Sequence, residues 1–195
     1  MAGVVLTGGA SARMGRDKTR LALGGVAGAV RAARLLESIV EDVILVGGDP
    51  PAAAPGRRVA DPTGPACALR GLVGGLGAAA APRVLVLATD LPFVPADLLL
   101  ALVAWPEAEA VVPWSARGPE PLCALYEREP ALRVARARLD AGELALQGVL
   151  AGLRMAKLDE AALAALDPEG RALTNLNTPD DLARTEAWLA SRRPR

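Results

Sequence analysis

The chain has 195 residues, of which 52% are hydrophobic and 23% charged, and its 22 basic residues balance 22 acidic ones. This length and composition favour one compact α/β domain with a sizeable core. The neutral charge, the single Phe and the single Tyr argue against nucleic-acid binding, which needs a basic surface and stacking side chains. The absence of histidine from the sequence excludes His-based zinc sites, Ser-His-Asp triads and Cys-His dyads.

Neither a secretory signal nor a membrane-spanning segment is evident in the sequence. No basic segment precedes the first apolar run, and the most apolar stretch, residues 84–105, is interrupted by Asp90, Pro92, Pro95 and Asp97. We therefore expect a cytoplasmic protein that does not contact a membrane. The two cysteines, Cys67 and Cys123, are too few for a disulfide framework or a zinc cluster, and we expect both to serve packing.

Apolar runs and helical periodicities alternate along the chain. The runs predict strands at residues 4–6, 43–46, 84–88, 110–113 and 122–126, a brief strand from Val59 and a last extended piece at 173–177. Helical patterns cover residues 29–39, 69–81, 95–105, 130–141 and 144–153, and a final helix opens at Pro179. This alternation predicts an α/β fold with a mostly parallel sheet and helices on both faces. We expect a single domain over residues 1–190 and a disordered basic tail at 191–195.

The first predicted strand leads into a glycine-rich loop at residues 7–18. In open α/β sheets, ligands bind outside the carboxyl ends of the strands. Gly8 and Gly9 let the backbone approach an anion closely, and Arg13 and Lys18 add positive charge to the same loop. The spacing matches neither a Walker A loop nor the G-x-G-x-x-G fingerprint. The loop therefore predicts a polyphosphate site, with a plain glycine turn carrying solvated charges as the alternative.

Two further strand ends carry polar residues. Asp90 follows the most apolar strand, where a carboxylate can hold Mg²⁺ against substrate phosphates, although an Asp before Pro92 can also simply form a turn. Asn175 and Asn177 are the only asparagines in the chain. They lie two residues apart on a predicted extended piece, so their amides would face the same side. Thr178 is placed to cap the helix that begins at Pro179.

Four segments carry a family resemblance when they are taken together and in order. They read L-x-G-G-x-S-x-R-M-G-x-D-K at residues 6–18, D-x-P-F at 90–93, E-P-L-x-A-L-Y at 120–126 and N-x-N-T-P-x-D-L at 175–182. In this combination the chain resembles the molybdenum cofactor guanylyltransferase family. A fifth family element, G-P-L-x-G-L, is matched only in part, because Cys67 and Ala68 replace its Gly-Pro before residues 69–72.

The resemblance implies a Rossmann-like nucleotidyltransferase that joins GMP from GTP to the terminal phosphate of molybdopterin, or of its molybdenum form, and releases pyrophosphate. It further implies as partners other proteins of molybdenum cofactor biosynthesis and the apo-molybdoenzymes that receive the product. The resemblance also assigns roles to residues of this chain. The nucleotide would contact Leu6, Thr7, Gly8 and Gly9, its phosphates would bind Arg13 and Lys18, and its guanosine would contact Asp61. Asp90 would hold Mg²⁺, and the pterin phosphate would face Asn175 and Asn177.

Other functions remain open at this point. A molybdopterin cytidylyltransferase would run the same chemistry, although similar cytidylyl enzymes usually carry Asp in the closing motif. Sugar-phosphate nucleotidyltransferases share the opening loop but usually need a longer chain. A non-catalytic nucleotide-binding module or cofactor chaperone would not require both Lys18 and Asp90. On the pterin side, Trp114 and the loop at 115–120 are candidates to cover the ring, with plain packing as the alternative, and residues 141–147 lack the basic residue expected there.

Overall fold

A twisted sheet forms the centre of the computed structural model, which describes residues 1–8, 22–64, 66–176 and 178–191. The strand order is β10-β7-β9-β6-β1-β4-β5, and the short β8 pairs with β7 beside this row. A separate hairpin joins β2 and β3. The strands are β1 (Ala2–Leu6), β2 (Ala22–Leu23), β3 (Val26–Ala27), β4 (Asp42–Val46), β5 (Arg57–Val59), β6 (Arg83–Ala88), β7 (Ala110–Ser115), β8 (Gly118–Pro119), β9 (Cys123–Glu127) and β10 (Met155–Leu158).

The main row of strands is mostly parallel, as the sequence predicts. Strand β1 pairs in parallel with both β4 and β6, β4 with β5, and β7 with β10. Within this row β9 alone runs the other way, antiparallel to β6 and to β7. Its beginning therefore lies beside the carboxyl end of β6. This reversal brings the segment before β9 to the edge of the sheet where ligands are expected.

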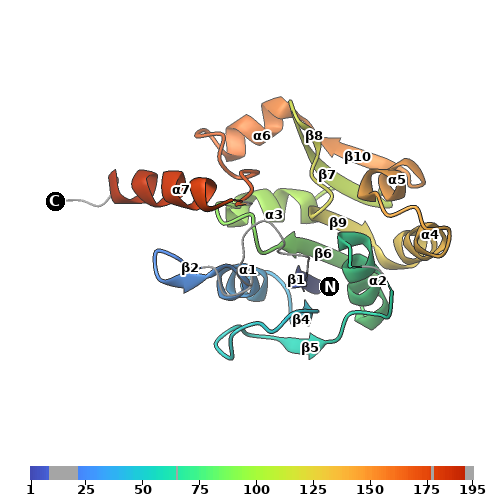
Figure 1. The fold of residues 1–195 in the computed structure, drawn as a ribbon. Coiled ribbons are helices and arrows are strands. Elements are labelled where there is room, and N and C mark those ends of the chain that lie inside the picture. The colour runs from blue at the N-terminus through green and yellow to red at the C-terminus, as the bar shows by residue number, and fades with distance from the viewer. Residues whose placement is uncertain (9–21, 65, 177, 192–195) are drawn as a thin grey trace.

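Helices cover both faces of the sheet (Figure 1). Side chains of β1 alternate between two apolar clusters, with Val5 in one and Val4 and Leu6 in the other. Helices α1 (Gly28–Glu37) and α3 (Ala96–Val103) pack on the first cluster, and α2 (Ala68–Ala78), α4 (Arg128–Asp140) and α5 (Leu146–Ala151) pack on the second. The expected α/β fold, a mostly parallel sheet with helices on both faces, is confirmed.

Several elements differ from the prediction. Strand β10 and helix α6 (Glu160–Leu166) were not predicted. Strand β10 is a half-exposed edge strand that includes Lys157, and α6 consists mainly of alanine, so neither shows a strong hydrophobic period. Residues 173–176 form no strand, and the expected extended piece is instead a loop.

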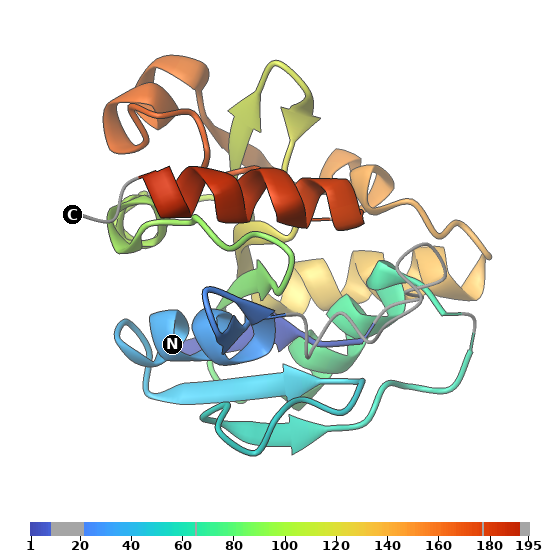
Figure 2. The same cartoon turned by 60° about the vertical axis from the view of Figure 1, so that its left-hand side comes forward.

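The chain ends in α7 (Pro179–Ser191), which projects from the body in Figure 1 and crosses in front of it in Figure 2. Thr178 caps this helix as expected. Its hydroxyl accepts a 3.1 Å hydrogen bond from the Asp181 backbone, while the Asp181 carboxylate accepts one of 2.9 Å from the backbone of Thr178. Ser191, the first residue of the expected tail, is the last residue of this helix, and residues 192–195 lie outside the described part of the chain.

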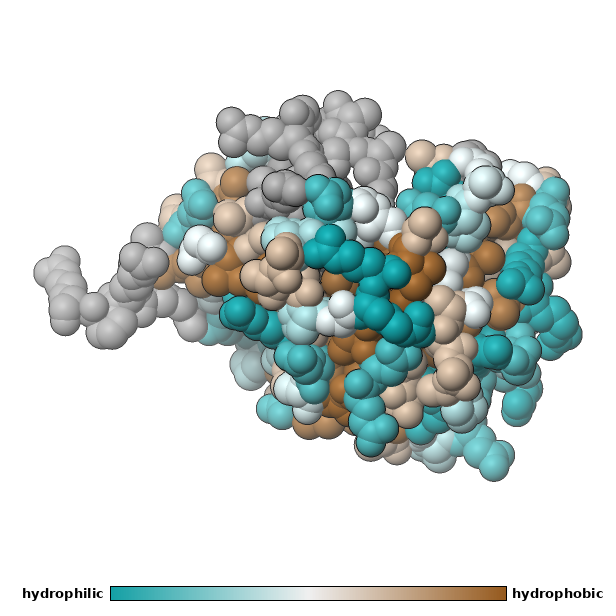
Figure 3. Space-filling view, turned by 90° about the horizontal axis from the view of Figure 1, so that it is seen from below, coloured by the Kyte–Doolittle hydropathy of each residue, from teal (hydrophilic) through white to brown (hydrophobic). Residues whose placement is uncertain are grey.

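Few large hydrophobic side chains are exposed among the described residues. They are Leu100 and Leu144. On the face shown in Figure 3, hydrophilic residues are spread among the apolar ones. None of the helices in the described ranges has the length and apolar character needed to cross a membrane.

Candidate active site

The carboxyl edge of β4, β1 and β6 brings several of the motifs together. Leu6 is in register with Val46 on one side and with Ala88 on the other. The residues that follow these three strands therefore leave the sheet at the same edge. From β6 to β5 this edge crosses three strand spacings, or about 15 Å. An extended nucleotide can lie along a span of this length.

The start of the glycine-rich loop is fixed by internal hydrogen bonds. The backbone amides of Thr7 and Gly8 each donate to the carbonyl of Val46 over 3.0 Å, and the Thr7 hydroxyl donates to the same oxygen over 2.9 Å. These two amides are therefore already used within the protein. Free backbone donors for an anion would have to come from later in the loop, where Gly9, Arg13 and Lys18 lie outside the described residues.

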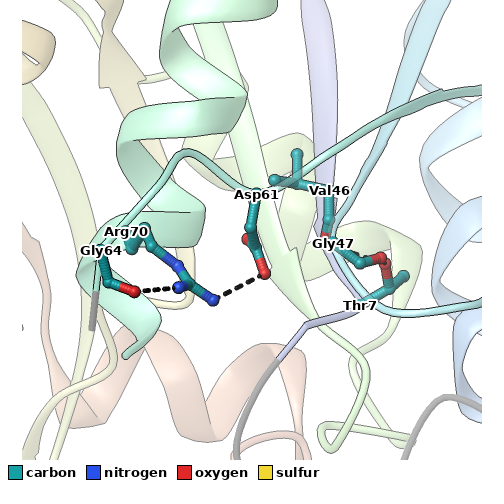
Figure 4. A network of polar contacts seen from close by, with 6 residues as sticks. All are labelled: Thr7, Val46, Gly47, Asp61, Gly64 and Arg70. Carbon is teal, nitrogen blue, oxygen red and sulfur yellow. Dashed lines mark hydrogen bonds and ion pairs between the residues drawn. The ribbon is translucent and has the colours of Figure 1, made fainter. Parts of the chain in front are cut away.

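Asp61 lies at one end of this edge, two residues after β5. Its Oδ2 atom forms an ion pair with Nη2 of Arg70, which lies 3.1 Å away in the first turn of α2 (Figure 4). The side chains of Asp61 and Arg70 are only 20% and 17% exposed. The structure thus places the predicted guanosine contact beside the beginning of the loop, and it adds an arginine that sequence reasoning assigned no role.

Asp90 lies toward the other end of the edge, after β6. Helix α1 begins at Gly28, close to this point. Only a glycine permits this approach, because a Cβ at Gly28 would lie 2.5 Å from the carbonyl oxygen of Thr89. The carbonyl of Asp90 accepts a 2.9 Å hydrogen bond from the backbone of Leu176. The D-x-P-F segment and the closing asparagine segment are therefore held together by the backbone.

Glu120 joins the same region from the segment before β9. Its carboxylate accepts a 3.3 Å hydrogen bond from the backbone of Leu122, and Glu120 lines the same hollow as Asn175. Burial raises the pKa of the Glu120 carboxyl above its usual value, and the negative charge of Asp90 raises this pKa further. The hydrogen bond from Leu122, the neighbouring Asn175 side chain and the charge of Arg117 lower this pKa and oppose the shift. Asp90, Glu120 and Asn175 therefore form one polar cluster.

A hollow of about 310 Å³ opens next to this cluster. Its polar lining comes from Ser115, Arg117, Glu120, Gln147 and Asn175. Arg117 comes from the β7–β8 turn and places a positive charge in the wall of this hollow, whereas residues 141–147 carry no basic side chain. Glu120 lies in the E-P-L-x-A-L-Y segment, but the sequence predicted no role for it. The sequence predicted none for Arg117 either. Asn177, the other predicted pterin contact, lies outside the described residues.

Two other candidates have structural contacts. The Trp114 ring is covered on one side by Lys157, whose Nζ lies 3.8 Å from the ring centroid. Cys123 is fully buried, and this burial strongly raises the pKa of its thiol, so it is not poised as a thiolate nucleophile. Both observations agree with packing roles.

Comparison with known proteins identifies related sequences. A model of the MobA-like NTP transferase domain matches residues 3–156. A protein of Chloroflexus aggregans named "Probable molybdenum cofactor guanylyltransferase" is 38% identical over 200 residues, covering 98% of this chain and 96% of the relative. A "Molybdenum cofactor guanylyltransferase" of Cereibacter sphaeroides is 36% identical and covers 96% of each chain.

Solved structures share the fold. The molybdopterin-guanine dinucleotide biosynthesis protein A of Archaeoglobus fulgidus superposes with a TM-score of 0.81 at 24% identity, covering 98% of this chain and 100% of the other. The 2-C-methyl-D-erythritol 4-phosphate cytidylyltransferase of Thermus thermophilus gives a TM-score of 0.73 at 19% identity, covering 96% and 98%. The two names differ in the nucleotide and in the acceptor, so these likenesses bear on the fold and not on the substrate.

Proposed function

Because the chain belongs to the family of MobA-like NTP transferases, we propose that it transfers GMP from GTP to the terminal phosphate of molybdopterin or its molybdenum form. An oxygen of the acceptor phosphate attacks the α-phosphorus of GTP. The bond from this phosphorus to the bridging oxygen breaks, and pyrophosphate leaves. The observation that carries the proposal is the joining of Asp90, Glu120 and Asn175, from three separate motifs, at the edge that also holds Asp61.

The nucleotide half of the site runs from β5 to β6. Asp61 contacts the guanosine. The nucleotide lies along the backbone of Leu6, Thr7, Gly8 and Gly9. Arg13 and Lys18 bind the phosphates and neutralise charge that builds up during transfer. Phosphoryl transfer needs mainly positioning and charge neutralisation from the protein, so a chain without histidine can perform it.

The donor groups at Asp90 suit magnesium. Within the described ranges no three His, Cys, Asp or Glu side chains gather into a metal-binding group. Mg²⁺ rarely uses such an all-protein cage and is usually held by one or two carboxylates together with substrate phosphates. Asp90 would supply that carboxylate. When bound there, Mg²⁺ would neutralise phosphate charge and align the α-phosphate for attack.

The acceptor half is the hollow beside Asn175. Asn175 offers an amide to the acceptor phosphate, and Asn177 follows it in the chain. Arg117 in the wall of the hollow supplies a positive charge for the same phosphate. Gln147 lines the same hollow and offers a further neutral hydrogen-bonding group. This arrangement separates the acceptor from the guanosine end of the site.

The nucleotide preference is tested by a thermal-shift panel of GTP, CTP, ATP and UTP with Mg²⁺. A ligand that binds only the folded state stabilises it by about 2.7 kcal/mol at a hundredfold excess over its Kd, so the ranking is measurable. We expect GTP to give the largest shift. A larger shift with CTP would favour a cytidylyltransferase instead. Release of pyrophosphate on adding molybdopterin separates an enzyme from a non-catalytic nucleotide-binding module.

A further inference from the structure

Arg70 bridges two residues of the loop that follows β5. Its Nη1 donates to the carbonyl of Gly64, and its Nη2 donates to Oδ2 of Asp61. Figure 4 shows the guanidinium lying between these two acceptors, with Asp61 pointing toward it. A planar guanidinium can serve two acceptors at once in this way, whereas a lysine ammonium acts as a point charge. The loop and the first turn of α2 are therefore fastened to each other.

The backbone of two other loops closes around the Asp61 carboxylate. A Cβ added to Gly8 would lie 2.7 Å from Oδ2, and one added to Gly47 would lie 2.6 Å from Cγ. Gly47 also has a positive φ of 71°, which a residue with a side chain adopts only with strain. The glycines after β1 and β4 thus leave a narrow space that this carboxylate fills. Its orientation is fixed by packing as well as by Arg70.

The two carboxylate oxygens have different surroundings. Oδ2 is held by Arg70, while Oδ1 accepts no hydrogen bond from any of the described residues. A carboxylate oxygen in a partly exposed site is a strong acceptor. The Nε of Arg70 is buried, and it finds no partner within the described part of the chain. The guanidinium is therefore not placed where it makes the most hydrogen bonds, and its position calls for another explanation.

We propose that Arg70 is a positioning residue for nucleotide selection, which holds Oδ2 of Asp61 so that Oδ1 remains as the single acceptor for one donor of the guanosine. This inference rests on the proposed function. The donor is the 2-amino group of guanine or the 2′-hydroxyl of the ribose, since both present hydrogen to a carboxylate. Without Arg70, Oδ2 loses its donor and becomes a second acceptor, so either oxygen of the carboxylate can take a donor and selectivity falls.

The test compares Arg70→Met with Arg57→Met. Arg57 makes a similar set of contacts, with a two-point pair to Asp42 at 3.0 and 3.1 Å and a 2.7 Å bond to the carbonyl of Ala78. It lies at the start of β5, and its side chain reaches Asp42 at the beginning of β4, away from the carboxyl edge that carries Asp61. Isothermal titration measures the Kd of GTP, inosine triphosphate and 2′-deoxy-GTP for each protein. Inosine triphosphate lacks the 2-amino donor of guanine, and 2′-deoxy-GTP lacks a ribose hydroxyl.

In the parent protein we expect GTP to bind about tenfold more tightly than one of these two analogues, the loss expected for one hydrogen bond to a charged group. Loss with inosine triphosphate indicates the base, and loss with the deoxynucleotide indicates the ribose. In Arg70→Met the ratio of the Kd of this analogue to the Kd of GTP should fall to within about twofold of unity, whereas Arg57→Met should keep the parental ratio. In an Asp61→Asn background, Arg70→Met should change the ratio no further, because the two residues act as one unit.

Two results would overturn the inference. One is an Arg70→Met protein that keeps the parental ratios, and the other is a parent protein that prefers GTP over CTP but binds all three guanosine-like ligands equally. If Arg70→Met does not fold, Arg70→Lys takes its place. Arg70→Lys should also lose the preference for GTP over the analogue, because a lysine has no planar guanidinium that can bind two acceptors. A lysine variant with the parental ratio of Kd values would count against the inference. A parent protein that prefers CTP over GTP would instead contradict the proposed function.

Discussion

The buried hydroxyl of Tyr126 donates a 2.8 Å hydrogen bond to the carbonyl oxygen of Pro121, five residues earlier in the chain. Tyr126 lies in β9 and is completely buried. The bond ties the strand to the turn that precedes it, and this turn presents Glu120 at the site. The tyrosine at the end of the E-P-L-x-A-L-Y segment therefore supports the glutamate at its beginning. This explains in physical terms why the two residues occur in one motif.

Tyr126→Phe should destabilise the protein by about 1–3 kcal/mol, because it leaves the buried carbonyl of Pro121 without its donor. Urea denaturation measures this change in the free energy of unfolding. Ser191→Ala is the matched control, since it also deletes a hydroxyl that donates to a backbone carbonyl, but at the exposed end of α7. The control should change stability by less than about 0.5 kcal/mol. Equal effects in the two variants would contradict the supporting role of Tyr126.

Glu120 should make the metal-free protein less stable as the pH rises above the usual glutamate value of 4.5. Burial raises the pKa of this carboxyl, so the folded state holds the proton more tightly than the unfolded state does. Its contribution favours folding at low pH, and this contribution is lost as the pH rises through the raised pKa. Glu120→Gln removes the titration but keeps an acceptor. The stability of the variant relative to the parent, measured by denaturation, should therefore increase from pH 4.5 to pH 7.

Glu109 provides the control of opposite sign. The backbone N–H of Arg154, at 2.8 Å from its carboxylate, lowers the pKa of Glu109 below 4.5. The folded state therefore favours the charged form, and this contribution is present above pH 4.5 and is lost as the pH falls through the lowered pKa. Glu109→Gln should lose stability relative to the parent as the pH rises from acid to neutral. The same slope in both variants would show that the titration of Glu120 does not follow its burial.

The parts of the fold that the sequence predicts are those with strong local patterns. Strands β1 and β6 are continuous apolar runs, and their parallel pairing follows from the alternation with helices. Strand β10 escapes this reasoning because an edge strand such as Met155–Leu158 needs no apolar run. The expected strand around Asn175 is wrong because residues 173–176 form no ladder with the sheet, and the backbone of Leu176 bonds instead to the carbonyl of Asp90.

The site shows the same division between local and long-range information. Asp90 could be singled out because it follows a predicted strand, where ligands of α/β proteins bind, whereas the role of Asp61 came from the family resemblance. The reversed direction of β9, which brings Glu120 to Asp90, depends on strand order and has no signature in a single sequence. Arg70 gave no signal either, because an arginine in a helix usually faces solvent. Only the folded chain shows that it reaches back to Asp61.

Asn175→Ala should weaken use of molybdopterin more than it weakens GTP binding. Asn175 lines the proposed acceptor hollow together with Glu120, whereas the proposed guanosine contacts lie across β1 and β4. We expect the KM for molybdopterin to rise about tenfold, as for the loss of one hydrogen bond to a charged group, and the same result is expected for Asn177→Ala. Titration with GTP and steady-state kinetics separate the two effects. Thr174→Ala, in the same loop, is the control. A lost GTP signal with unchanged pterin affinity would reverse the assignment.

Asp90→Asn is the most direct test of the metal site. The carboxylate follows the most apolar strand of the sheet, and its backbone is held by the bond from Leu176. Asparagine keeps the shape and the hydrogen-bonding reach of the side chain but removes the charge that Mg²⁺ needs. Turnover should therefore fall at least about a hundredfold, which corresponds to about 2.7 kcal/mol of transition-state stabilisation.

The melting temperature of the metal-free Asp90→Asn protein should change by less than about 3 °C, the shift that about 1 kcal/mol produces in a chain of this size. If Asp90 only shaped the turn before Pro92, the pattern would be reversed, with a lower melting temperature and nearly normal turnover. Asp97→Asn, at the exposed first turn of α3, removes the same charge seven residues away and should leave turnover unchanged. An Asp90→Asn protein that transfers GMP at the parental rate would refute the assignment, because no loss of structure could then be hiding the effect.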